Sequence, residues 1–216
     1  AEGWLTSATS NYAHAEGWNT TSSGEDSHSE GFGTVASGAD SHAEGLNTIA
    51  SGTSSHSEGF NTTSTGTASH TEGFDTLASA DAAHSEGYSS TASGLASHAE
   101  GFETTSSGSF SHAGGSSSIA SGDTSFIHST NSLVTGSRSV VLGGQNITGT
   151  TDDTVYVPYL NINDLATGTS VNNLGIDSGG NVVVSSTSGS GDFLPLTGGT
   201  VSGTTLPVLT VYGSGD

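Results

Sequence analysis

Residues 41–54 read S-H-A-E-G-L-N-T-I-A-S-G-T-S, and residues 55–68, which follow directly, read S-H-S-E-G-F-N-T-T-S-T-G-T-A. The two stretches share the same serine, histidine, glutamate, glycine, asparagine and threonine at the same places. A fixed period of this length is the sequence signature of a repeat architecture, in which each unit stacks on its neighbours. This pair of units decides the fold, because most of the chain is in register with it.

Histidine, glutamate, glycine and a bulky residue recur in a fixed order along most of the chain. The unit can be written S-H-A-E-G-(aromatic)-x-T-x-(A/S)-S-G-x-x, with a second glycine near its end. Disordered low-complexity sequence does not keep such a phase, so we expect a folded repeat protein. The histidines are His14, His28, His42, His56, His70, His84, His98 and His112; the acids are Glu16, Glu30, Glu44, Glu58, Glu72, Glu86 and Glu100; the bulky residues are Trp4, Trp18, Phe32, Leu46, Phe60, Phe74, Tyr88 and Phe102.

The same register continues where these letters stop. Phe126 and Val140 stand in the histidine position, and His128 and Leu142 stand in the acid position, where Gly114 has already replaced the glutamate. About ten units therefore extend from residue 1 to about residue 147. Because the chain starts inside a unit and without Met, we expect it to be a segment of a longer protein.

Fourteen residues with two glycines suit one coil of a narrow parallel β-roll, in which strand, turn, strand and turn follow one another. Alternation along the first strand places histidine and acid on one face and the small residue between them, such as Ala43 or Ser57, on the other. The second strand comprises residues 34–36 and their equivalents. We expect glycine at both corners, coils about 4.8 Å apart and a rod of about 50 Å. The glycine content and the lack of a 3.6-residue apolar stripe exclude helix, so the predicted fold class is all-β, a β-solenoid.

The apolar content of the chain is low for a protein that folds alone. Only 30% of the 216 residues are apolar, whereas ordinary globular domains have about 45–50%. At about 25 cal/mol per Å² of buried apolar surface, one coil can hardly offset about 1–2 kcal/mol of backbone entropy per residue. We therefore expect identical rolls to share an axis as a closed homo-oligomer that buries the remaining face of each.

Charge and cysteine content exclude several classes of function. The chain has 21 acidic side chains, a single basic one, Arg138, and no cysteine. One arginine cannot supply the basic surface that a phosphate backbone requires, so we expect no nucleic-acid partner. Disulfides, zinc-cysteine sites and cysteine catalysis are excluded. No apolar run approaches the about 18 residues of a membrane span, so we expect no membrane insertion in this segment.

The pattern S-x-A-x-G…A-S-G-x-x-S resembles the head repeats of trimeric autotransporter adhesins. Residues 139–143, Ser-Val-Val-Leu-Gly, are close to the standard unit of that family, whereas most units read S-H-A-E-G, a variant similar to head-repeat segments of bacteriophage and giant-virus tail fibres. The resemblance covers about two thirds of the chain. It implies a left-handed parallel β-roll that forms a homotrimer.

The C-terminal third leaves the repeat. Residues 154–162 are typical of a strand at an edge or crossover position because of Pro158, and residues 174–184 are typical of a β-hairpin around a glycine-rich turn. Residues 192–203 resemble a short shaft repeat of phage tail fibres. We expect three parts: a β-roll head or shaft over residues 1–147, a β-rich connector with a hairpin over residues 148–190, and a fibre-shaft-like segment over residues 191–216.

The histidine and glutamate columns are the main candidates for a functional site. Two hypotheses stay open: the columns bind a transition metal, for which imidazole and carboxylate are suitable ligands, or they lie buried at the subunit interface and hydrogen-bond each other. Apolar replacements at the same positions favour the interface, and we expect no cofactor. The metal candidates are His28, Glu30, His42, Glu44, His56 and Glu58. The interface candidates are His14, Glu16, His28, Glu30, His42, Glu44, His56, Glu58, His70, Glu72, His84, Glu86, His98, Glu100, Phe126, Val140 and Leu142.

A column of carboxylates requires compensation of its charge. Carboxylates about 4.8 Å apart repel by roughly 3–4 kcal/mol per neighbour at an effective dielectric constant near 20. The adjacent imidazoles are the only local source of compensation. We therefore expect many of them to be protonated or strongly hydrogen-bonded to glutamate, with a raised pKa.

The sequence also allows expectations for three further groups of residues. We expect the bulky row to pack inside a corner or between subunits rather than to stack on carbohydrate. The acids in the turns are expected to form a solvated negative surface. Asp152, Asp153 and Asp164 offer hard oxygen ligands that suit calcium.

These features predict a non-catalytic trimeric fibre segment that attaches to a host-cell surface as part of a viral (phage) tail fibre. Its place is extracellular, in a virion tail fibre or a cell-surface appendage, and its partners are further copies of itself and a glycan or polymer of the host surface. Two alternatives stay open: the head of a bacterial trimeric autotransporter adhesin, and a metal-binding structural repeat. We expect no catalytic residues, because a pair repeated in every coil lacks the unique site that an enzyme needs.

Overall fold

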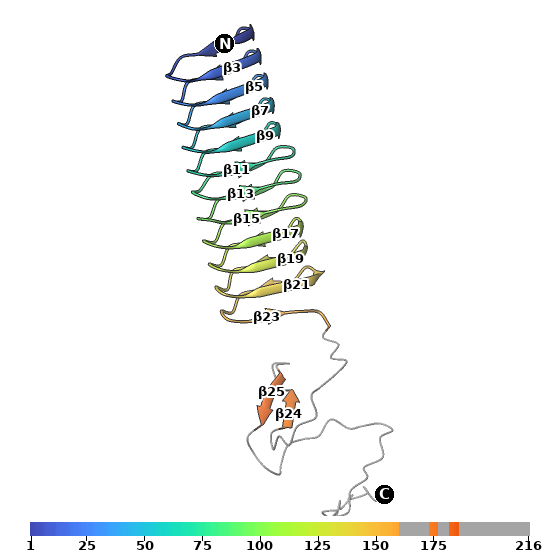
Figure 1. Ribbon diagram of the computed structural model, residues 1–216. Coiled ribbons are helices and arrows are strands. Elements are labelled where there is room, and N and C mark those ends of the chain that lie inside the picture. The colour runs from blue at the N-terminus through green and yellow to red at the C-terminus, as the bar shows by residue number, and fades with distance from the viewer. Residues whose placement is uncertain (160–172, 177–181, 186–216) are drawn as a thin grey trace, which may run out of the picture. The chain divides into compact units, whose positions relative to one another are not determined.

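The computed structural model describes residues 1–159, 173–176 and 182–185, and these residues form strands and turns without a helix. Between residues 1 and 159 successive strands alternate between two parallel sheets, so the chain winds as a β-solenoid of about eleven coils (Figure 1). The predicted all-β class and the solenoid of 14-residue repeats are therefore confirmed.

The two parallel sheets take alternate strands of the chain. The first sheet contains β1 (Glu2–Trp4), β3 (His14–Trp18), β5 (His28–Phe32), β7 (His42–Leu46), β9 (His56–Phe60), β11 (His70–Thr71), β13 (His84–Ser85), β15 (His98–Ala99), β17 (His112–Ser116), β19 (Phe126–Thr130), β21 (Val140–Gln145) and β23 (Val155–Tyr156). The second sheet contains β2 (Ser7–Ala8), β4 (Thr21–Ser22), β6 (Val35–Ala36), β8 (Ile49–Ala50), β10 (Thr63–Ser64), β12 (Leu77–Ala78), β14 (Thr91–Ala92), β16 (Thr105–Ser106), β18 (Ile119–Ala120), β20 (Leu133–Val134) and β22 (Thr148–Gly149).

Each strand pairs with the equivalent strand of the next coil. His42 lies beside His56 in the first sheet, at an offset of one repeat. Where the first-sheet strands are shorter, single bridges such as the one between Phe60 and Phe74 continue the same pairing. Every position of the repeat therefore forms a column of equivalent residues along the stack.

Only small side chains fit between the two sheets. Alanine is the apolar residue of the interior through most of the stack, and larger buried side chains occur only in the last coils, at Ile127, Val134 and Val141. Serine and threonine hydroxyls fill the remaining space; Ser57 Oγ lies 2.8 Å from Thr62 Oγ1. The interior is thin and largely polar, so it buries little apolar surface.

The two glycine columns lie where neighbouring coils approach most closely. Gly45 is inside β7 with a φ of +108°, and a Cβ built on it would lie 2.3 Å from the carbonyl oxygen of Gly59. Gly38 opens a turn, and its Cβ would lie 2.0 Å from the carbonyl oxygen of Gly52. Glycine was expected at both corners. This is wrong for the first column, whose glycines, such as Gly45 in β7, come before the corner. Glycine is needed there because the coil spacing leaves no room for a Cβ.

The corners are formed by residues in the left-handed region that are mostly not glycine. Each coil has one after the bulky position, such as Asn47 or Asn61, and one before the serine, such as Asp40. Asparagine and aspartate adopt this region more readily than other residues that carry a side chain. The N–H of Asn61 donates to the carbonyl oxygen of Leu46 at 2.8 Å, so hydrogen bonds between coils continue through the turns.

The parallel stack continues past residue 147 by one further coil. One residue is inserted near Gly143 and Gly144, both in the left-handed region, and the offset between paired strands becomes 15 residues from Val140 to Val155. β23 pairs only with β21 and is the last strand of the first sheet. Of the strand predicted over residues 154–162, only β23 is present in the described residues; it ends before Pro158 and belongs to the solenoid, because the insertion leaves the pairing intact.

A second compact unit comprises residues 162–216. Within it β24 (Asn173–Ile176) pairs antiparallel with β25 (Val182–Ser185). This pairing agrees with the predicted hairpin. The remainder of the predicted connector after residue 159 and the predicted shaft-like segment 191–216 lie outside the described residues.

Replacement of Gly45 by alanine is expected to destabilise the solenoid by at least about 2 kcal/mol. The new Cβ would meet a backbone carbonyl oxygen at 2.3 Å, and alanine would have to keep a φ of +108°. The control is Gly33→Asn, because Gly33 has a φ of +68° and its Cβ would meet only the Asn47 side chain. Thermal unfolding followed by circular dichroism measures both; a G45A variant as stable as wild type would contradict the role of this column.

Candidate functional site

One face of the first sheet carries the histidine, glutamate and bulky columns side by side, and we call it the outer face. Side chains two residues apart on a strand share a face, so His42, Glu44 and Leu46 project from it together, whereas Ala43 between them is fully buried. The paired histidine and glutamate side chains are between 26% and 39% exposed. The structure thus brings the interface candidates together on one half-buried face.

The imidazole rings form a continuous stack. From His14 to His98 neighbouring ring centroids are 4.7–5.0 Å apart, and the planes differ by at most 9°. The His112 ring is turned by 80° from that of His98 and stacks on Phe126 at 4.7 Å. Phe126 therefore continues the column, as the register predicts.

Each imidazole faces the carboxylate of the preceding coil. His42 Nε2 lies 3.7 Å from Glu30 Oε1, and His98 Nε2 lies 3.2 Å from Glu86 Oε1, the latter a hydrogen bond. Residues two apart on one strand are separated by about 6–7 Å, whereas adjacent coils are closer. The pairs therefore join neighbouring coils rather than residues of one strand.

Four of the imidazoles have a pKa shift opposite to the one that would offset the carboxylates. Burial, followed by the charge of neighbouring histidines, lowers the pKa of His28, His56, His84 and His112. The expected rise in pKa is therefore wrong for these four residues. A stack of protonated rings would repel itself, and neutral rings can pack in contact.

The glutamate column lowers its own charge. A hydrogen bond with Glu44 raises the pKa of Glu30 and of Glu58 to about 7. Hydrogen bonds with Glu58 and Glu30 lower the pKa of Glu44, and hydrogen bonds with Glu86 and Glu58 lower that of Glu72. Raised and lowered pKa values thus alternate from Glu30 to Glu72, which reduces the repulsion expected from the sequence in this part of the column.

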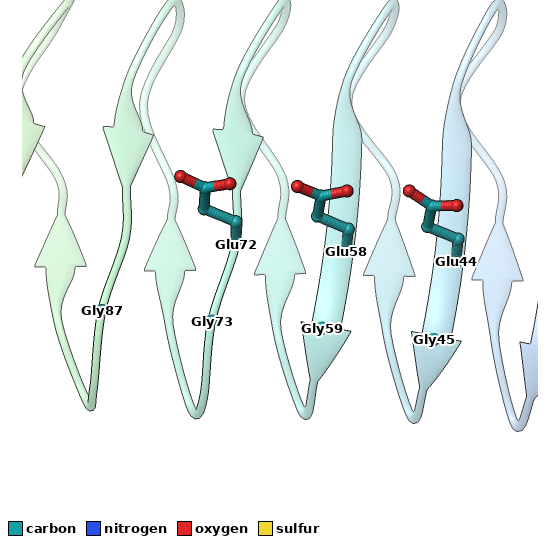
Figure 2. Close-up of a pocket in the computed structure, with 7 residues that line it drawn as sticks. All are labelled: Glu44, Gly45, Glu58, Gly59, Glu72, Gly73 and Gly87. Carbon is teal, nitrogen blue, oxygen red and sulfur yellow. The ribbon is translucent and has the colours of Figure 1, made fainter.

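A shallow groove follows the glutamate column. The carboxyl groups lie in line along one wall, and glycine backbone lies beside them (Figure 2). The groove repeats the same groups from coil to coil. Its lining residues are Glu44, Gly45, Glu58, Gly59, Glu72, Gly73 and Gly87.

The bulky row lies at the surface of the chain. Trp18 is 53% exposed and Tyr88 is 44% exposed. From Phe60 to Phe102 the rings stack with centroids 4.8–5.1 Å apart and planes within 8° of parallel. Of the two expected packing positions, the inside of a corner is therefore wrong for the single chain, because the interior admits only small side chains.

The columns place the metal candidates within reach of one another. Glu30, His42 and Glu44 offer ligand atoms within 4.8 Å of one another, as do Glu44, His56 and Glu58. Each of these sets has one imidazole and two carboxyl groups, and the same carboxyls serve adjacent sets. A further set, formed by Glu100, His112 and His128, was not among the sequence candidates, although the glutamate-to-glycine change at residue 114 marks its place.

Several turn acids have protein partners and do not only contact solvent. Asp81 Oδ1 accepts from the N–H of Thr67 at 2.9 Å, one coil away, and Asp123 Oδ1 accepts from the N–H of Ser109 at 3.0 Å. Both acids are exposed, as expected of a solvated negative surface, and they also join adjacent turns.

The calcium candidates are also engaged by the protein. Arg138 Nε donates to Asp153 Oδ1 at 2.6 Å and Arg138 Nη2 donates to Asp153 Oδ2 at 2.9 Å. Asp152 Oδ1 accepts from the N–H of Ser137 at 2.9 Å. Asp164 lies outside the described residues. The carboxylates of Asp152 and Asp153, which were expected as calcium ligands, therefore contact protein groups and stabilise the last turn.

No protein-family model matches the chain, and no curated protein is significantly similar to it. In the part of the chain that the structure describes, no helix is long and apolar enough to cross a membrane. The functional proposal therefore rests on the fold, on the outer face and on the resemblance of the repeat.

The glutamate column of the wild-type protein is expected to contribute stability that is lost as pH rises from about 4.5 to about 7. Because the pKa of Glu30 and Glu58 is about 7 in the folded chain, above the ordinary 4.5, the folded state holds protons in this range that the unfolded state has released, so stability falls with rising pH and levels off above about 7. The histidines with a lowered pKa have the opposite effect below pH 6.5. There the unfolded state takes up protons more readily than the folded state, so stability is lost as pH falls. Thermal unfolding at a series of pH values measures the slope.

Glu58→Gln should flatten this decrease, because glutamine keeps the shape and a hydrogen-bond donor without the charge. Carboxylates about 4.8 Å apart repel by about 1 kcal/mol in a water-like dielectric, and a gain of this size is expected at the upper end of the pH range. Glu25→Gln removes the same charge from an exposed turn and should leave the slope unchanged. Equal slopes in E58Q and wild type would exclude proton sharing in the column.

Proposed function

We propose that the chain is a non-catalytic segment of a homotrimeric fibre, a left-handed β-roll that serves attachment to a host-cell surface as part of a viral tail fibre. Two further copies of the chain are its partners along the outer face. A glycan or another polymer of the host surface is the ligand class. The protein acts outside the cell, in a virion.

The distribution of large side chains carries this proposal. The interior of the coils contains mainly alanine, serine and threonine, whereas the bulky row is exposed along the stack, with Phe60 at 39% and Trp18 at 53%. An extended exposed apolar strip is typical of an interaction surface. A thin polar interior and an apolar exterior together indicate a chain that is completed by a partner.

Copies of the same chain suit this face better than an unrelated partner. The columns have a constant spacing, so parallel copies around one axis bring equivalent coils to the same level. Neutral imidazoles and partly protonated carboxyls also permit the columns of neighbouring copies to approach. In the last coils Phe126, Val140 and Leu142 replace the polar columns with apolar side chains, which favours the same contact.

The repetition of the outer face supports a structural role over catalysis. Catalysis requires acid, base and substrate-binding groups that differ from one another at one place. The columns instead present the same imidazole, carboxyl and aromatic groups in coil after coil. A rod of this kind can project or space a binding surface, and the resemblance of the S-H-A-E-G variant to repeats of viral fibres supports a viral origin.

A second candidate is the head of a bacterial trimeric autotransporter adhesin. The coil that contains Ser139–Gly143 favours it, because this coil has apolar residues in both variable positions, as the standard unit of that family does. The complete reading frame separates the two candidates. A signal peptide and a C-terminal membrane anchor would select the adhesin, and neighbouring genes for virion proteins would select the tail fibre.

Sedimentation is expected to give a particle of about three times the 21.2 kDa of the chain. Combined replacement of Phe60, Phe74 and Tyr88 by serine, which the repeat already accepts at Ser116, should lower that mass. The control replaces the second-sheet residues Ile49, Leu77 and Ile119 by threonine, which occupies the same position at Thr63, Thr91 and Thr105. A folded wild-type monomer at micromolar concentration would contradict the proposal, as would trimer loss only in the control.

Attachment to a host surface is tested by binding to an array of cell-surface polysaccharides. We expect retention on neutral polymers, because a net charge of −20 on each chain repels anionic ones. The serine triple variant should lose this binding together with the trimer. Failure of the intact trimer to bind any surface polymer would contradict direct attachment by this segment.

A further inference from the structure

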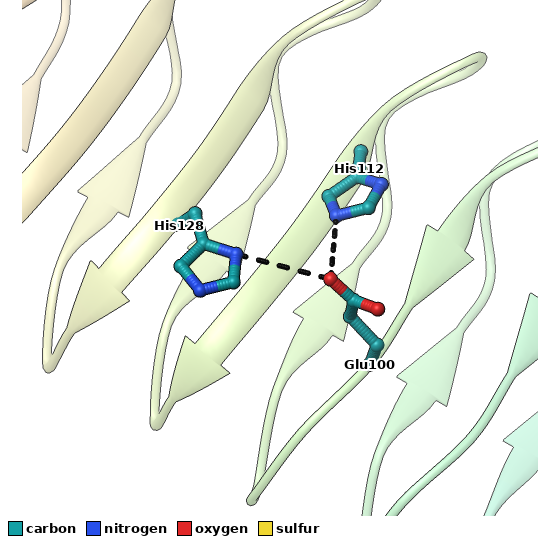
Figure 3. A group of neighbouring side chains, drawn as sticks. All are labelled: Glu100, His112 and His128. Atoms are coloured by element: carbon teal, nitrogen blue, oxygen red, sulfur yellow. Dashed lines mark ion pairs between the residues drawn. The ribbon is translucent and has the colours of Figure 1, made fainter.

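The glutamate column ends at a defect in the repeat. Glu100 is its last carboxylate, Gly114 takes the place of the next one, and His128 follows one coil later (Figure 3). A Cβ built on Gly114 would lie 2.7 Å from His128 Nδ1 and 3.1 Å from Glu100 Oε1. The missing side chain therefore allows groups from two coils apart to face each other across the intervening coil.

Two imidazoles converge on one carboxylate oxygen at this place. His112 Nε2 lies 3.3 Å from Glu100 Oε1, and His128 Nδ1 lies 3.8 Å from the same oxygen (Figure 3). The three ligand atoms lie within 4.8 Å of one another. The His112 ring has left the parallel stack by a rotation of 80°. Its Nε2 is buried without a hydrogen-bond partner, as is the Nε2 of His28, His42, His56, His70 and His84 in the regular stack.

We propose that Glu100, His112 and His128 bind one divalent transition-metal ion of the zinc class per chain. Zinc binds histidine nitrogen and carboxylate oxygen at about 2.0–2.2 Å, which places ligand atoms of a tetrahedral site about 3.3 Å apart. The contact between His112 and Glu100 already has this length, and that between His128 and Glu100 needs a shift of about half an ångström. Water completes the coordination, since His128 is 58% exposed.

The regular columns lack this combination of ligands. Each regular set pairs one imidazole with two carboxyl groups that also face the next coils, and its ring is held in the parallel stack. At the defect two imidazoles, which transition metals favour, meet a carboxylate with no acidic neighbour on one side. The site is thus distinct from the metal candidates His28, Glu30, His42, Glu44, His56 and Glu58, and an ion bound there links three successive coils.

Calorimetric titration of the full chain with zinc tests the proposal. We expect one ion per chain, whether the chain is a monomer or a trimer, and a rise in the unfolding temperature on saturation. Cobalt should give the visible absorption of a tetrahedral ion with nitrogen ligands. His128→Ala should weaken binding at least about 100-fold, since even outer-shell changes cost 10–100-fold.

The control is His70→Ala, which removes an imidazole from the regular stack and should leave the titration and the cobalt spectrum unchanged. Far-UV circular dichroism verifies that both variants keep the solenoid. Glu100→Gln gives a second test that retains the shape of the side chain and should also abolish the cobalt spectrum. Absence of zinc binding by the wild type, or equal binding by H128A, would overturn the site; dependence on His70 would place the ion in the regular columns instead.

Discussion

Backbone hydrogen bonds run from each coil to the next through the strands and also through both turns. The N–H of Ile49 donates to Thr62 O at 2.9 Å in the second sheet, and the N–H of Asp40 donates to Glu25 O at 2.8 Å in a turn. This continuous ladder holds neighbouring coils at one spacing along the whole stack. It leaves no room for a Cβ in the glycine columns. Through most of the stack the interior holds alanine, serine and threonine, with larger buried side chains at Ile127, Val134 and Val141, and the aromatic side chains lie outside.

The same spacing places equivalent side chains in contact, so the protonation state of each side chain depends on that of its neighbours in the column. Imidazoles held about 4.8 Å apart are most stable as neutral rings, and carboxyl groups at that distance are most stable when a proton lies between neighbours. The two columns consequently reach a low charge without a basic residue. The only arginine, Arg138, pairs with Asp153 at the last turn of the stack. In the described residues the acids are divided about equally between the glutamate column and the turns.

Much of the fold could be predicted from the sequence, because a fixed period with one small residue between histidine and glutamate defines both the coil and its inner face. Ala43 and Ser57 are buried, and Phe126 continues the histidine stack, as the register indicates. The place of glycine was misjudged, since glycine has two uses, in turns and at close approaches, that the period does not separate. Asparagine and aspartate mark some of the corners, such as Asn47 and Asp40, but alanine, serine and aromatic residues occupy others, so residue type alone does not locate them.

The site was less predictable because its contacts join different coils. His42 pairs with Glu30 because the two side chains tilt toward each other across neighbouring strands. The spacing of residues along one strand does not reveal this tilt. The direction of the histidine pKa shift depends on burial, which outweighs the nearby carboxylates. The cluster of Glu100, His112 and His128 arises from one missing side chain, and it becomes visible only when residues 28 positions apart are placed on the same column.

We propose that a coil with so thin an interior is stable only when other copies of the chain cover its outer face. This dependence is tested most directly by the midpoint of thermal unfolding measured over a wide range of chain concentration. Unfolding coupled to dissociation predicts a midpoint that rises steadily with concentration. A midpoint that stays constant, with a single folded chain at the lowest concentration, would contradict the claim.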